Sequence, residues 1–139
     1  MSLSETISPL IGRWLLAWFY VGSARHIAAD WQDVTEQLLA RHVPVPPLAM
    51  LVVLVLLAIG VLSLVVGYHA RHGAVMLFGL TVAAAFFLHD YWRIADPALR
   101  MAEHEIFIRD LAICGGLLIV IGLGPGPFSI DARGGAKKK

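Results

Sequence analysis

Arginine, histidine and aspartate side chains gather beside the ends of long apolar stretches in this sequence. Imidazole and carboxylate groups can relay protons, and a guanidinium can donate to a carbonyl, a carboxylate or a phosphate. Such side chains in or beside a membrane segment are costly and usually face the interior of a helix bundle. The candidates for a ligand site or a proton relay are Arg25, His26, His89, Asp90, Trp92, Arg93, His104, Arg109 and Asp110.

These residues have two leading interpretations, and the sequence does not choose between them. In the structural one, Arg25, Arg93 and Arg109 pair with Asp90 and Asp110 and clamp helix ends together. In the functional one, the same groups line a polar pocket at the membrane interface. A quinone or a lipid head group would accept hydrogen bonds from arginine or histidine there, while a carboxylate relays protons.

A third interpretation is a haem or metal site. His26, His89 and His104 fall at the same end of three different apolar segments, and two facing histidines can ligate the iron of haem b. The sequence contains no pair of ligand residues at a spacing typical of metal sites, so no metal ligand is assigned. No residue is assigned as catalytic, and no cofactor of the chain's own is expected.

The composition indicates that these residues belong to a membrane protein. Of the 139 residues, 58% are hydrophobic and 15% charged, whereas soluble domains have about 25% charged residues. A helix that crosses the bilayer needs about 20 apolar residues. The sequence predicts an all-α bundle of four transmembrane helices running up-down-up-down, in one domain over 1–131 with a polar tail over 132–139. The predicted spans are 7–27, 48–67, 74–92 and 106–123.

A short amphipathic helix is predicted in the loop between the first two spans. Trp31, Val34 and Leu38 share one helical face, and Asp30 stands where a cap would be. Such a helix would lie on the membrane surface or pack on the end of the bundle as an ordinary connection.

Other local signals set the predicted ends and packing of the spans. Asp96 and Pro97 predict a helix start ahead of the fourth span, and the Gly-Pro-Gly-Pro sequence after it predicts a stop. Arg13 is expected to extend to the membrane interface. Small residues permit close helix approach, and those we expect to do so are Ala17, Gly22, Gly79, Ala83–Ala85, Gly115 and Gly116.

Charge and cysteine content exclude several functions. The net charge of +1 argues against a nucleic-acid binder, and the single cysteine, Cys114, excludes an internal disulfide. No P-loop or nucleophile elbow is present. Four spans place both termini on one side, which carries six basic residues against five on the other. This slight excess favours cytoplasmic termini in a plasma (inner) membrane.

Four segments occur in an order that resembles a known family. They are Pro44–Pro46, His89–Trp92, Phe107–Leu118 and Gly124–Asp131. Together they resemble the DoxX family of small four-helix bacterial and archaeal membrane proteins. The positions that match the family's motifs are His89, Asp90, Trp92, Arg109, Asp110 and the segment Gly124–Asp131, and the resemblance does not say which of them touch a ligand.

The resemblance also implies a function. It points to an accessory subunit of a quinone-linked redox or respiratory complex, without its own redox cofactor, whose partners are membrane lipids and the other subunits of that complex. Two alternatives remain: an autonomous quinone- or haem-binding oxidoreductase and a small transporter. A transporter would need a carboxylate deep in the membrane, and Asp110 is the residue that approaches that depth.

Overall fold

The computed structural model describes residues 3–135, and every regular element in that range is a helix. The long helices are separated by short connections, as predicted, and two short helices and a 3-10 turn complete the chain. The elements are α1 (Leu3–Ala29), α2 (Trp31–Ala40), α3 (Pro46–Val66), α4 (Ala70–Phe87), the 3-10 turn η1 (Tyr91–Arg93), α5 (Pro97–Leu123) and α6 (Ile130–Gly135).

Local sequence signals explain where the helices begin and end. The Asp96 side chain accepts hydrogen bonds from the backbone N–H groups of Ala98 and Leu99, at 2.8 and 3.3 Å, and Pro97 opens α5. Gly67 ends α3 in the left-handed region at φ +71°, which a glycine adopts without strain. Helix α5 ends at Leu123, just before the Gly-Pro-Gly-Pro sequence. The predicted start and stop of the fourth segment are confirmed.

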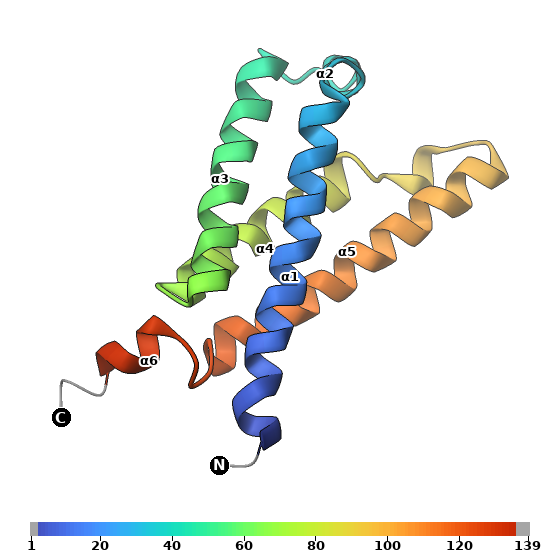
Figure 1. Cartoon of the computed structure of the whole chain (residues 1–139). Coiled ribbons are helices and arrows are strands. Elements are labelled where there is room, and N and C mark those ends of the chain that lie inside the picture. The colour runs from blue at the N-terminus through green and yellow to red at the C-terminus, as the bar shows by residue number, and fades with distance from the viewer. Residues whose placement is uncertain (1–2, 136–139) are drawn as a thin grey trace.

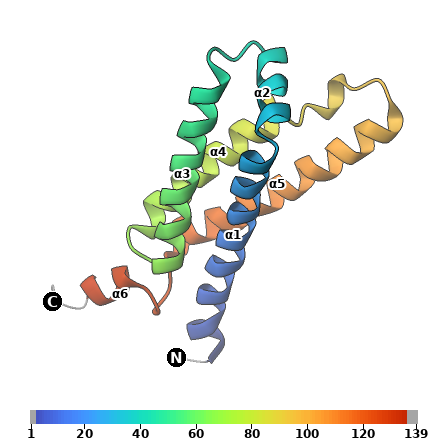
Figure 2. The same ribbon diagram turned by 45° about the horizontal axis from the view of Figure 1, so that its top comes forward.

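The four long helices pack in chain order. Helix α1 packs on α3, α3 on α4 and α4 on α5, while α1 meets α5 over fewer residues. The α4–α5 pair diverges from the α1–α3 pair, so the bundle opens toward one end (Figures 1 and 2). The beginning of α1 and helix α6 lie at the opposite end. Among the described residues, this places the first and last segments on the same side, as the sequence predicts.

A small core holds the bundle together. Its members come from all four long helices: Ala17, Tyr20, Leu57, Leu64, Ala74, Leu77, Leu117 and Val120. The closest approach is between α3 and α4, where a Cβ on Gly60 would lie 2.5 Å from the Leu77 side chain and one on Gly73 would collide with Ser63. The small residues expected to mediate packing are confirmed in part. Ala17 and Ala85 are buried, and a Cβ on Gly116 would contact Leu16. Nothing lies within 4 Å of a Cβ added at Gly22, Gly79 or Gly115.

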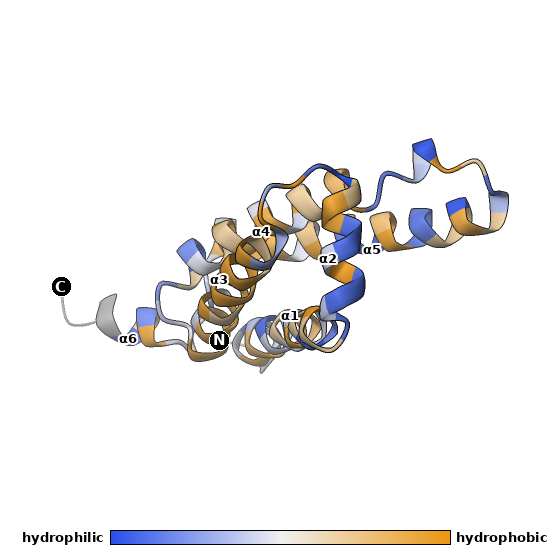
Figure 3. Ribbon diagram, turned by 90° about the horizontal axis from the view of Figure 1, so that it is seen from above, coloured by the Kyte–Doolittle hydropathy of each residue, from blue (hydrophilic) through white to orange (hydrophobic). Residues whose placement is uncertain are grey.

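Three of the described helical segments are long and apolar enough to cross a membrane. They are Pro46–Val66, Ala70–Arg93 and Pro97–Leu123, with mean hydropathies of 3.2, 1.6 and 2.2. In Figure 3 most of the α3 ribbon has the colour of hydrophobic residues. Helix α1 is long enough at 27 residues, but it is not among the segments that qualify by hydropathy. A helical membrane protein is thus confirmed, and the count of four spans is not.

Two predicted boundaries fall beside irregular or short elements. Helix α4 ends at Phe87, but the membrane-capable segment that contains it continues through η1 to Arg93, one residue beyond the predicted end of the third span. The predicted polar tail starts inside α6, and residues 136–139 of it lie outside the described part of the chain. The helix predicted in the first loop is present as α2, but the Asp30 side chain makes no capping hydrogen bond and pairs with His26 instead.

Candidate functional site

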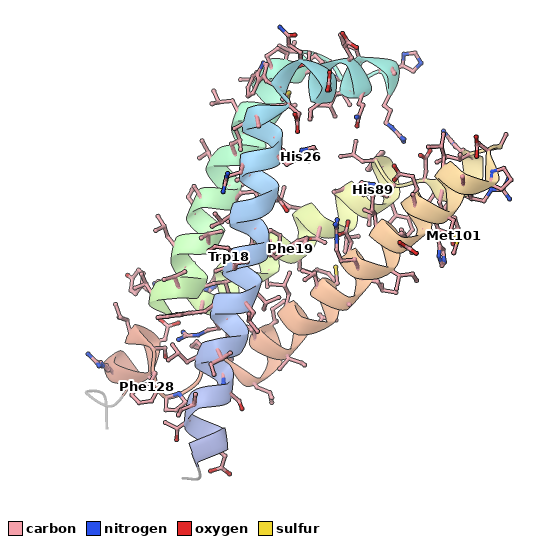
Figure 4. The ribbon with its side chains drawn as sticks, turned by 45° about the vertical axis from the view of Figure 1, so that its right-hand side comes forward. Trp18, Phe19, His26, His89, Met101 and Phe128 are labelled. Carbon is pink, nitrogen blue, oxygen red and sulfur yellow. The ribbon has the colours of Figure 1, made fainter. Side chains whose placement is uncertain are left out.

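Most of the sequence-predicted site residues lie at the open end of the bundle. We call this the polar end and define it by residues 25–30, 87–93 and 97–110. It contains the end of α1, the exit from α4 and the first half of α5. Figure 4 shows His26 and His89 toward this end and Phe128 at the other. The structure therefore places on one side of the molecule residues that come from three separate helices.

Asp90 is the most tightly held group of the polar end. It is 7% exposed, and its Oδ1 accepts a hydrogen bond from Arg41 Nη2 at 2.7 Å. Arg41 also donates to the carbonyl oxygens of Phe87 and Leu88 at the end of α4. Arg93 is a second, exposed partner at 3.6 Å. One arginine from the first loop therefore both caps α4 and neutralises Asp90.

The expected pairing of charges is correct in part. Arg93 does approach Asp90, and Arg109 pairs with Asp110 at 3.1 Å. Arg25 pairs with neither aspartate in the described structure. The sequence analysis did not anticipate Arg41, which lies beyond α2 at a distance of 49 positions from Asp90. Its only sequence signal is that it is a lone arginine in a predicted interfacial loop.

His89 and the aromatic residues fasten the start of α5 to the exit from α4. His89 Nδ1 lies 2.8 Å from Glu103 Oε2, and the Tyr91 ring meets the His104 ring edge-on at 4.8 Å. Trp92 belongs to a cluster in which ring centroids lie 5.3 to 6.2 Å apart, and it remains 50% exposed. Edge-to-face contacts of this kind stabilise the packing. The other rings of the cluster are Phe86, Tyr91 and Phe107.

Arg109 links α5 to α1, and Asp110 pairs with it further into the bundle. Asp110 is 3% exposed, so the deep position predicted for it agrees with its burial. The Arg109 guanidinium lies over the Phe19 ring, 5.2 Å from its centroid. A buried hydrogen bond of 2.6 Å joins Tyr20 and Thr81 nearby. The deeper polar groups thus have partners within the bundle.

The remaining candidates are at the surface. Arg25, Arg93 and His104 are exposed, and the His26 side chain is 71% exposed even though its ring bonds to Asp30. Arg25 and His26 line a shallow hollow of about 320 Å³ on α1. Within residues 3–135, no group of three or more histidine, cysteine or acidic side chains is placed to hold a metal ion. The three histidines considered as ligands are not assembled into such a group.

A second charged cluster, which the sequence analysis did not propose as a site, lies at the opposite end. We call it the tail end and define it by residues 9–13, 67–72 and 122–133. Arg13 is 1% exposed there and donates through Nη2 to the Phe128 carbonyl at 2.6 Å. Its Nε and Nη1 have no hydrogen-bond partner in the described structure. The expectation that Arg13 extends to the membrane interface is wrong, because the segment after α5 folds over it.

Asp131 organises this segment. Its carboxylate accepts from the backbone N–H groups of His69 and Ala70, at 2.9 and 3.0 Å, and thereby caps α4. Its own N–H donates to the Gly67 carbonyl, and the Ser129 hydroxyl accepts from the N–H of Ala132 in α6. The Ser-Ile-Asp sequence after Gly-Pro-Gly-Pro carries a helix-capping pattern that could have revealed this fold-back.

Comparison with known proteins identifies the family. A model of the SURF4 family matches residues 47–139, from the first turn of α3 to the end of the sequence. The chain belongs to the SURF4 family. It is 28% identical over 137 residues to a Surfeit locus protein 4 homolog from Drosophila melanogaster, a match that covers 97% of this chain and 43% of the fly protein.

Other relatives of this SURF4 family member come from bacteria and yeast. The inner membrane protein YqjF of Escherichia coli is 27% identical over 94% of this chain and 95% of its own length. The ER-derived vesicles protein ERV29 of Saccharomyces cerevisiae is 30% identical over 57% of this chain and 25% of its own length. The chain thus spans less than half of the eukaryotic relatives and nearly all of the bacterial one. No solved structure matches it.

These matches correct the family and the function inferred from sequence. The chain belongs to the SURF4 family, so the resemblance to the DoxX family was wrong. The predictions that rested on it, namely a redox-complex subunit linked to the respiratory chain, electron transport and a quinone, are therefore wrong as well. The misleading segments lie at helix ends. Glycine and proline stop helices, and aromatic residues gather at membrane interfaces, in many unrelated membrane proteins. What stands is a multi-pass membrane protein, with relatives in both bacteria and eukaryotes.

Proposed function

We propose that this SURF4 family member is a membrane-embedded binding protein that holds a partner protein at its polar end and makes or breaks no covalent bond. The observation that carries the proposal is the state of the two aspartates in the candidate site. Asp90 and Asp110 are both buried, and each is bound to an arginine. Asp90 joins the exit from α4 to Arg41 in the first loop, and Asp110 pairs with its neighbour Arg109 within α5, so both carboxylates already have a charged partner in the fold.

The surface of the polar end offers the contacts for a partner. Arg25 and His26 are exposed at the end of α1, and Arg93 and His104 are exposed at the exit from α4 and the start of α5, where Trp92 is half-exposed. Arginine and tryptophan are enriched in the energetic centres of protein interfaces. The paired groups beneath would hold these side chains in place. The structural and functional interpretations of the cluster therefore apply to different residues.

The membrane arrangement is part of the proposal. We infer that α1 is a fourth span, because it is 27 residues long, packs along α3 and has its central charge, Arg13, covered by protein. Four spans place both termini on one side, and the slight basic excess there favours the cytoplasm. The nearly full-length match to an inner membrane protein of Escherichia coli supports a bacterial or archaeal plasma membrane.

The names of the relatives support binding over catalysis. One relative is named for ER-derived vesicles and another for the inner membrane, so both names describe a location and neither specifies a reaction.

Site-specific photo-crosslinking in native membranes tests the proposal. A photoreactive residue at Arg25 or at His104 should give an adduct with one discrete protein. The matched control is Ile59, which is 52% exposed in the middle of α3, and a photoreactive residue there should give lipid adducts. If the polar-end positions give lipid adducts alone, and the protein purifies without a stoichiometric partner, the proposal is overturned.

A further inference from the structure

The tail end contains a groove of about 570 Å³ that the proposed function does not use. The start of α4 forms one wall, with His69, Arg71 and His72. The Gly-Pro-Gly-Pro segment and the beginning of α6 form the other, where α6 folds back beside the turn between α3 and α4 (Figure 1). We call this feature the tail groove. It lies on the opposite side of the molecule from the polar end.

Arg71 supplies an available charge in the tail groove. The side chain is exposed, and its one hydrogen bond to the described protein is a long contact of 3.5 Å from Nη2 to the Gly122 carbonyl. The guanidinium rests against Gly124, where a Cβ would lie 3.3 Å from Nη2. Its Nε and Nη1 donors therefore remain for a ligand. A guanidinium with two adjacent N–H groups matches two oxygens of a phosphate.

Two imidazole rings extend the donor surface next to Arg71. The rings of His69 and His72 lie 5.5 Å apart, and both side chains are exposed at the groove. Asp131 is the carboxylate among the lining residues, and its two oxygens already accept the N–H groups of His69 and Ala70. The buried Arg13 guanidinium also attracts this carboxylate. The groove therefore favours an anion in spite of Asp131.

The surroundings of the groove are those of a lipid contact. Leu123, Phe128 and Ile130 are 83%, 51% and 47% exposed, and all three adjoin the groove in sequence or line it. The groove joins the start of one membrane-capable helix, α4, to the end of another, α5. Apolar side chains beside a free guanidinium at this level match the acyl chains and the head-group phosphate of a phospholipid.

We propose that the tail groove binds an anionic phospholipid, with Arg71 donating to its phosphate and the exposed apolar side chains contacting its acyl chains. A soluble phosphate ester carries the same phosphate group and could bind Arg71 in the same way. The exposed leucine, phenylalanine and isoleucine favour the lipid, because a soluble ester would gain nothing from them.

Native mass spectrometry of the full chain tests this proposal, with phosphatidylglycerol and phosphatidylcholine titrated into detergent micelles. The wild type should bind one phosphatidylglycerol in preference to phosphatidylcholine. Arg71→Gln should weaken that binding about tenfold, which is the loss of one charge-assisted contact. His72→Gln removes an exposed ring with no hydrogen bond to the described protein, so it should fold normally and weaken binding about two- to threefold.

Arg100→Gln is the matched control, because Arg100 is an exposed arginine that bonds to the backbone carbonyls of Ile94 and Ala95 far from the groove. It should bind phosphatidylglycerol as the wild type does. The proposal is overturned if Arg71→Gln and His72→Gln bind as tightly as the wild type, or if the two lipids bind equally. If millimolar glycerol 3-phosphate displaced the lipid, the proposal of a lipid ligand would be overturned, and the groove would instead be a site for a soluble phosphate ester.

Discussion

The two ends of the bundle hold their charges by different means. At the polar end, side chains pair with side chains: the His26–Asp30 pair is largely exposed, the His89–Glu103 pair is partly buried, and Asp90 is buried against Arg41. At the tail end, Arg13 is buried and binds a backbone carbonyl, and Asp131 binds backbone N–H groups. Exposed pairs contribute little to stability, whereas a buried charge that loses its surroundings is expensive. We therefore expect the tail end to be the more sensitive of the two.

The largest effect is expected from Gly67→Ala at the tail end. Gly67 has φ +71°, and a Cβ there would collide with Arg13 Nη1 and lie 2.6 Å from the Cβ of Ser129. The strained backbone and the collision together should cost about 3 kcal/mol of unfolding free energy. Thermal unfolding in detergent, followed by helical circular dichroism, measures the loss.

Gly22→Ala is the control for that variant. Gly22 lies within α1, and nothing lies within 4 Å of a Cβ added there. Alanine is the better helix former by about 1 kcal/mol, so this variant should be neutral or more stable. Equal losses for the two glycines would mean that the fold-back over Arg13 does not contribute to stability.

A smaller effect is expected from Asp90→Ala at the polar end. The change leaves Arg41 without its carboxylate but with its two carbonyl acceptors, so about 2 kcal/mol should be lost. Arg93→Gln should cost less than about 0.5 kcal/mol, because the Arg93 side chain is 79% exposed. The same unfolding measurement compares them. If Arg93→Gln lost more unfolding free energy than Asp90→Ala, Arg93 would contribute more to stability than the structure indicates, and Arg41 would not be the main partner of Asp90.

The smallest effect is expected from His26→Ala. The two side chains of the His26–Asp30 pair are 71% and 45% exposed, so the change should alter the unfolding free energy by less than about 0.5 kcal/mol. His89→Ala is the comparison, since the pair of His89 with Glu103 is only 23% and 32% exposed. If His26→Ala destabilises the protein as much as Asp90→Ala, the polar end is held by all of its pairs and the contrast between the two ends fails.

Much of the helical layout follows from local sequence. Apolar stretches of the right length predict the long helices, and Asp96 with Pro97 fixes the start of α5 within the chain itself. Periodicity also predicts α2. These features depend on residues within a few positions of each other. Local sequence also predicts that the candidate residues gather at one end of the bundle, because each lies near the end of a predicted helix.

Long-range partners could not be predicted in that way. Arg41 and Asp90 are separated by 49 positions, and Arg13 and Phe128 by 115. Which glycine meets a neighbouring helix depends on how the two helices are rotated about their axes. Because α3 is apolar on all sides, its sequence does not reveal that rotation. The structure shows that Gly60 and Gly73 make the close approach and that Gly22, Gly79 and Gly115 do not.

The sequence by itself determined that this is a helical membrane protein whose polar residues gather at helix ends, because hydropathy and helix signals act over neighbouring residues. Short motifs at those ends did not determine the family, which a match over residues 47–139 did. Only the tertiary structure decided that Arg13 is buried beneath the segment after α5 and that Arg41 clamps Asp90. The physical reason is that a charge in a low-dielectric interior takes whichever partner the packing of distant segments brings to it.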